Sequence, residues 1–116
     1  MEKSILISTK KILGLSAEYT PFDLDIITHI NMTFAVLNQL GVGPTNGFYI
    51  EDSIPTWDNY QTTDSQTTNL VKTYVFLKVK SLFDPPTNSF LAEAFNKQIN
   101  EIEWRLNVIR EGYVTT

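Results

Sequence analysis

The proline pair Pro85-Pro86 is the feature that most constrains how this chain can fold. An apolar-rich segment with helical spacing, Lys72 to Phe83, reaches Asp84 and stops, and a second long amphipathic segment begins within a few residues. Proline lacks the amide donor that a helix interior needs, and it disfavours helical backbone in the residue before it. The pair therefore predicts two long helices joined by a short turn.

Two further helices are predicted earlier in the chain. A short apolar stretch precedes Gly14, a residue that suits a helix end. Thr20 and Pro21 suit a helix start, and the apolar residues that follow recur every three or four positions. The expected fold is therefore mainly α, a small bundle of about four helices. These helices are expected near residues 5–13, 21–40, 69–82 and 88–109.

Residues 43–66 interrupt the helical pattern. Phe48-Tyr49-Ile50 is a short run of strand-forming residues, so a short extended or β insertion is expected between the second and third helices. The Thr-, Ser-, Asp- and Gln-rich stretch after it is typical of a solvated loop. A loop of this length is unusual in a compact domain, which indicates that residues 45–66 have a function or small elements of their own.

The apolar positions predict a core, together with more apolar surface on the third helix than one small domain can bury. In the last helix they form a single stripe from Leu91 to Ile109. In the third helix Phe76 and Val79 lie away from the main apolar face, so that a neighbouring subunit is expected to cover them. The expected core is Phe22, Ile26, Ile30, Phe34, Leu37, Leu70, Tyr74, Leu77, Phe95, Ile99, Ile102 and Leu106.

The chain is expected to form one domain. A length of 116 residues suits a single core. Residues 1–109 are predicted as one helical domain, and residues 110–116, with Gly112 as a hinge, as a tail that becomes ordered on a partner. No apolar run approaches the roughly 18–20 residues of a membrane span. Lys10 and Lys11 interrupt the first apolar patch, so it does not read as a secretory signal.

The sequence presents no catalytic, cofactor-binding or metal-binding set, and the chain is expected not to be an enzyme. It has no cysteine and one histidine, which excludes thiolate and histidine-rich metal sites. His29 lies near the edge of an apolar stripe without an acid cluster, which favours a boundary histidine over a general base. Pro44 prevents Gly41 to Gly43 from acting as a dinucleotide loop. The net charge of −4 argues against gripping of nucleic acid.

Trp104 is the sharpest candidate for a contact with another protein. It lies almost opposite the stripe of its helix, so either a loop covers it or it anchors an interface, where tryptophan is enriched. Lys78 falls within the apolar face of its helix, either as a lysine that extends to solvent or in an ion pair with Asp84, Glu103 or a neighbouring chain. The expected interface residues are Trp104, Phe76, Lys78, Val108, Ile109, Arg110, Tyr113 and Val114.

A set of short segments, spread over most of the chain, carries a family resemblance. They are Lys10–Gly14, Phe22–Ile27 with His29–Asn31, Leu37–Gly43, Val71–Tyr74 with Leu77–Lys80, Leu82–Pro86, and Glu103–Asn107. In this order they resemble the small head–tail connector proteins of tailed bacteriophages and prophages, also called head completion or portal adaptor proteins.

The resemblance implies a structural role without cofactors. Such proteins are helical, form a ring (typically twelve-fold) beneath the portal protein, and join a downstream neck or tail-completion protein. Their C-terminal segment commonly reaches into the portal. It implies a place at the head–tail junction of the virion, after synthesis in the host bacterial cytoplasm, with genomic DNA passing through the channel unbound and no membrane contact.

The alternative class is a small helical DNA-binding or packaging accessory protein. It would need a basic recognition face. Lys72, Lys78 and Lys80 form the only local basic cluster, and one of them points into an apolar face. An acidic chain better suits a channel through which DNA must slide.

Overall fold

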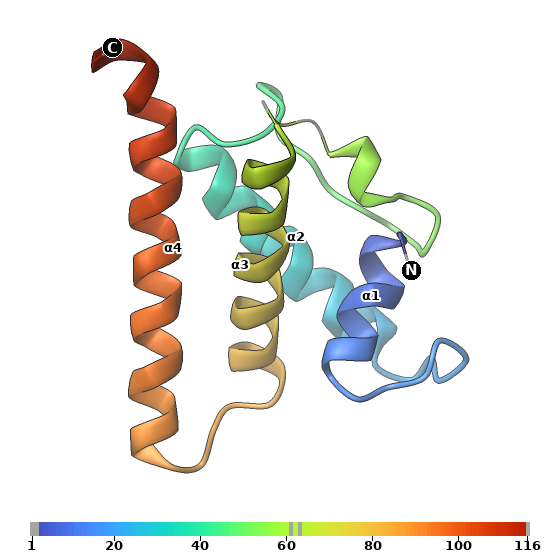
Figure 1. The fold of residues 1–116 in the computed structure, drawn as a ribbon. Coiled ribbons are helices and arrows are strands. Elements are labelled where there is room, and N and C mark those ends of the chain that lie inside the picture. Colours follow the sequence, from blue (N-terminus) through green and yellow to red (C-terminus); the bar gives the residue numbers. More distant parts are fainter. Residues whose placement is uncertain (1–2, 61, 63, 116) are drawn as a thin grey trace.

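In the part of the chain that the structure describes, the fold consists of four helices and a 3-10 turn (Figure 1). The computed structural model describes residues 3–60, 62 and 64–115, with side chains described as far as Ile109. The elements are α1 (Ile5–Ile12), α2 (Asp23–Gln39), η1 (Trp57–Asn59), α3 (Ser65–Phe83) and α4 (Ser89–Thr115). The prediction of a mainly helical bundle with a non-helical insertion between the second and third helices is confirmed.

Helix α3 is the central element, and each of the other three helices packs against it. Helices α3 and α4 run antiparallel, side by side, and the turn at Pro85-Pro86 joins them (Figure 1). Helix α2 packs on α3, and α1 packs on both α2 and α3 at the end of the bundle remote from α4. Helix α3 thus has neighbours on several sides within its own chain. This arrangement explains why it is apolar nearly all round without a second subunit.

Side-chain caps set where α1 and α3 begin, whereas α2 begins at Asp23 without such a cap, two residues after its predicted start. The Ser4 hydroxyl accepts a hydrogen bond from the Ile7 amide at 3.2 Å at the start of α1. The Asp64 carboxylate accepts one from the Thr67 amide at 2.7 Å, and this bond lowers the pKa of Asp64. With that cap, α3 begins at Ser65, four residues before the predicted start.

The last helix is longer than predicted. Helix α4 continues to Thr115, beyond its expected end near residue 109, and its end projects past the start of α3 (Figure 1). The division into a domain and a tail at residues 110–116 stays a prediction, and Thr116 lies outside the described residues.

The insertion before α3 is held by a helix side chain instead of a strand partner. The Asn31 amide nitrogen donates to the Ile50 carbonyl at 2.9 Å, and its oxygen accepts from the Ile50 amide at 2.8 Å. Both backbone groups that a β-ladder would use are therefore satisfied from α2. Within the described chain, the expected extended piece at residues 48–50 forms no strand, and the one bridge joins Ser4 to Thr56.

The insertion also contributes to the core, which the sequence did not predict. Ile50, Trp57 and Tyr60 are buried. The Phe34 ring of α2 stacks on Tyr60 with centroids 5.0 Å apart. Gly43 allows this packing, since it has a φ of +88° and a Cβ there would collide with the Tyr60 ring. The insertion therefore supplies part of the hydrophobic core.

Most of the predicted core is confirmed, and four positions are corrected. Phe22 is 40% exposed, while Leu70, Leu77 and Phe95 are only partly buried. Val79, which was expected on the outer side of α3, is fully buried, because the α3 stripe that faces the interior is offset around the helix from the predicted one. That buried stripe consists of Val71, Tyr74, Val75 and Val79.

Candidate protein interface

An open groove of about 490 Å³ lies between α3 and α4, near the start of α3. Its floor and walls combine apolar and uncharged polar side chains. Among the described residues that line it, Arg105 is the only charged one. The lining consists of Gln66, Asn69, Leu70 and Thr73 from α3, with Trp104, Arg105, Val108 and Ile109 from α4.

Helical geometry keeps Trp104 out of the core, and its side chain lines the groove. Ile102 and Leu106 are buried, and Trp104 lies two positions from each, about 200° around the helix. It is 63% exposed, and Val108 one turn later is also exposed. Large apolar side chains gathered in a hollow on the surface are typical of a site that another protein covers.

A hydrogen bond joins the two helices beside the groove. The hydroxyl of buried Tyr74 donates to the Glu103 carboxylate at 2.6 Å. Burial of the Tyr74 phenol raises its pKa, and the negative charge of Glu103 raises it further. This contact fixes α4 against α3, so that the groove walls keep their spacing.

The predicted interface residues are only partly brought together. Trp104, Val108 and Ile109 line the groove. Phe76 lies elsewhere, with its ring edge-on to Trp57 at 5.9 Å, so the insertion covers it. Arg110, Tyr113 and Val114 belong to the last turns of α4, where side chains lie outside the described residues. A contact role for each of these residues stays a prediction.

In the described part of the chain Lys78 forms no ion pair with Asp84 or Glu103, and an ion pair with a neighbouring chain stays a prediction. Lys78 is partly buried. The Glu103 carboxylate accepts the Tyr74 hydrogen bond instead. Lys72, from the same predicted basic cluster, places its ammonium 5.8 Å from the centroid of the Trp57 ring.

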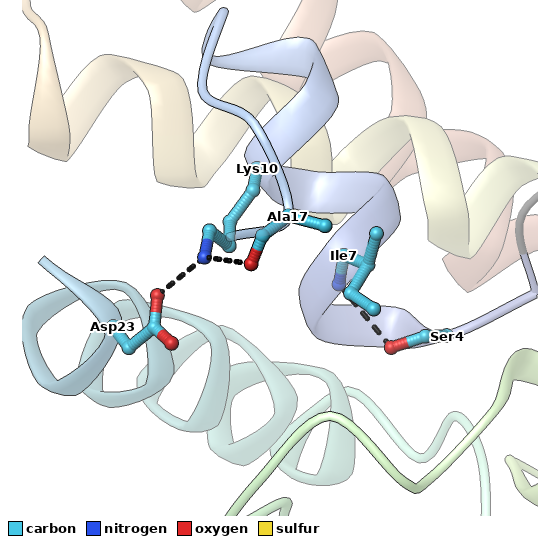
Figure 2. A network of polar contacts seen from close by, with 5 residues as sticks. All are labelled: Ser4, Ile7, Lys10, Ala17 and Asp23. Atoms are coloured by element: carbon cyan, nitrogen blue, oxygen red, sulfur yellow. Dashed lines mark hydrogen bonds and ion pairs between the residues drawn. The ribbon is translucent and has the colours of Figure 1, made fainter. Parts of the chain in front are cut away.

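The sequence reading missed a buried lysine. Lys10 is only 1% exposed, and its ammonium lies 2.8 Å from the Asp23 carboxylate and 3.1 Å from the Ala17 carbonyl (Figure 2). The contact joins α1 to the first turn of α2 and fastens the loop between them. The signal in the sequence was a lysine among apolar residues of α1, together with an acid in the first turn of the next helix.

No chemical site emerges elsewhere in the described residues. They contain no cluster of three or more side chains suited to a metal, and none of their helices has the length and hydropathy needed to cross a membrane. His29 is partly buried, and its Nδ1 has no hydrogen-bond partner among them. Its position agrees with a histidine at the edge of the core.

Comparison with known families adds one match. A family model described as "Phage connector protein" matches residues 5–113, which include α1, α2 and α3 in full and nearly all of α4. Neither the curated proteins nor the solved structures contain a match to this chain.

Proposed function

The chain belongs to the phage connector protein family, and from this premise we propose that it forms a ring at the head–tail junction of a tailed phage. The ring lies beneath the portal protein, joins the capsid to the tail, and extends the channel through which DNA passes. The family match over residues 5–113 is the observation that carries the proposal. A structural role between phage head and tail agrees with that family.

Surface composition supports assembly into a ring, for which twelve copies are the expected number. Trp104 and Val108 expose apolar area in a groove, and a chain that acted alone would gain nothing from leaving it open to water. A ring also needs the rigid subunit that this fold supplies, with α3 enclosed by the other helices.

The charge of the chain supports a channel through which DNA slides. Its net charge is −4, and phosphate binding depends on clustered lysine and arginine. Lys72 is engaged with the Trp57 ring, which leaves a weak basic face for a DNA-binding accessory protein. DNA therefore passes without specific binding.

We assign portal contact to the end of α4. The helix continues to Thr115 and projects past the start of α3 (Figure 1). A projecting helix end can enter a groove of another protein without unfolding the bundle. The opposite end of the ring would then meet a downstream neck or tail-completion protein.

Binding to portal and to DNA tests this function. The purified chain is mixed with the portal protein of the same phage in one experiment and with duplex DNA at moderate salt in another. We expect stable binding to the portal and no retardation of DNA in a gel. Retarded DNA without portal binding would contradict the proposal and favour a packaging accessory protein.

A further inference from the structure

A second exposed surface lies on the opposite side of the bundle from the groove. The loop from Tyr49 to Ile54 runs beside α1, which lies on the far side of the bundle from α4 (Figure 1). The groove lies between α3 and α4. Tyr49 is 68% exposed and Ile54 is 78% exposed. Between them, Glu51 and Asp52 are also exposed. The loop therefore presents two large apolar side chains and two carboxylates together.

The loop is held in shape although its tip is exposed. At its start, Asn31 bonds both backbone groups of Ile50. At its end, the Ser4 hydroxyl donates to the Ser53 carbonyl at 2.7 Å, and the Ile5 amide donates to the Pro55 carbonyl at 3.1 Å.

Within the tip, the Asp52 carboxylate accepts a hydrogen bond from the Ile54 amide at 2.9 Å. A loop fixed in this way loses little conformational entropy when a partner covers it. Exposed apolar side chains on a preorganised loop are suited to insertion into a hollow.

The groove and the loop are complementary in shape and in charge. The groove is concave and combines apolar with uncharged polar side chains, and Arg105 is its charged residue among those described. The loop is convex and presents Tyr49 and Ile54 beside two carboxylates, and the Glu51 carboxylate has no hydrogen-bond or ion-pair partner in the described chain. Arg105 has only a 3.5 Å contact with Glu101, one turn away on the surface. Such a surface pair is weak, so the guanidinium stays available to a second carboxylate.

We propose that the α3–α4 groove receives the Tyr49–Ile54 loop of a second copy of this chain. The inference rests on the proposed ring and names the two faces that close it. Two different patches on opposite sides of one subunit give a head-to-tail contact, which repeats around a ring when the rotation closes. Tyr49 and Ile54 pack against Trp104 and Val108, and Glu51 pairs with Arg105.

Cross-linking between copies tests this contact, because the chain has no cysteine of its own. Ser53→Cys marks the loop and Thr73→Cys marks the groove, and both leave the apolar anchors in place. The two variants are mixed and treated with a short thiol-reactive cross-linker. We expect a linked dimer from the mixture, a ladder of multimers from the double variant, and no dimer from either single variant alone.

Matched variants separate specific docking from random collision. Asn96 is exposed on α4 outside the groove, so a chain with Asn96→Cys is expected to give no cross-linked dimer with the Ser53→Cys chain. Arg105→Glu in the groove-marked chain is expected to reduce linking roughly tenfold, and Glu51→Arg in the loop-marked chain to restore it. Lys97→Glu, an exposed charge reversal on α4, is expected to leave linking unchanged.

The outcomes distinguish this contact from the ring itself. Equal linking through Asn96, or dimers from one single variant alone, would overturn the head-to-tail pairing. So would a full yield of linked dimer with Arg105→Glu. If the unmodified chain assembles on the portal while the marked pair does not link, the ring stands and this contact is wrong. If the unmodified chain assembles neither alone nor on the portal, the proposed function fails as well.

Discussion

Removal of the buried ammonium of Lys10 is expected to destabilise the fold strongly. Lys10→Ala leaves the Asp23 carboxylate, 2.8 Å from the lost ammonium, without its counter-charge, and it leaves the Ala17 carbonyl without a donor. Breaking a buried ion pair by removing one partner typically costs about 3–5 kcal/mol. Asp23 is still 28% exposed, so water recovers part of the loss, and we expect about 2–4 kcal/mol.

Urea unfolding followed by circular dichroism measures this loss. Lys11→Ala is the matched control, because Lys11 is the next residue, is exposed, and should change stability by less than about 0.5 kcal/mol. The double variant Lys10→Met with Asp23→Asn removes both charges and should recover much of the stability, since the carboxylate no longer lacks a partner. A loss below about 1 kcal/mol in Lys10→Ala, or equal losses in Lys10→Ala and Lys11→Ala, would contradict a stabilising role of the Lys10–Asp23 ion pair.

Three other predictions concern packing, pH and assembly. Gly43→Ala should lower the melting temperature by several degrees, since the added Cβ meets the Tyr60 ring at a positive φ; an unchanged melting temperature would contradict this. Stability should fall as the pH rises above about 10, because burial raises the pKa of the Tyr74 phenol above its value in the unfolded chain. Tyr74→Phe should reduce that alkaline loss, and a pH profile identical to that of the parent would exclude the phenol as its source. Trp104→Ala should leave the monomer folded and weaken self-association by about 2 kcal/mol, measured by sedimentation; parental association would remove Trp104 from the interface.

The helices could be predicted because their signals are local. The stripe in α4 steps by three or four residues, and Ile99, Ile102 and Leu106 are buried as that spacing requires. The turn between α3 and α4 follows from Pro85-Pro86 alone. Local spacing also placed Trp104 away from the core and at the surface.

The remaining errors come from contacts between residues distant in the sequence. Asn31 bonds Ile50 from 19 positions away, and no local pattern marks an asparagine as the partner of a loop. Phe76 was likewise expected to need a second subunit to cover it, but the distant residue Trp57 of the insertion covers it within the chain. The helical angle placed Val79 wrongly on the outer side of α3. The angle alone does not show which neighbouring helices surround α3.

Ring formation on the portal can be tested by measuring the mass of the complex with the portal protein. The full chain and a chain that ends at Ile109 are each mixed with portal rings, and the masses of the intact assemblies give the number of bound copies. We predict a closed ring of the full chain on each portal, with about as many copies as the portal has subunits. The shorter chain is expected to stay folded but to attach much more weakly. Portal rings that bind no copies of the full chain, or single copies at scattered occupancy, would contradict a ring-forming connector.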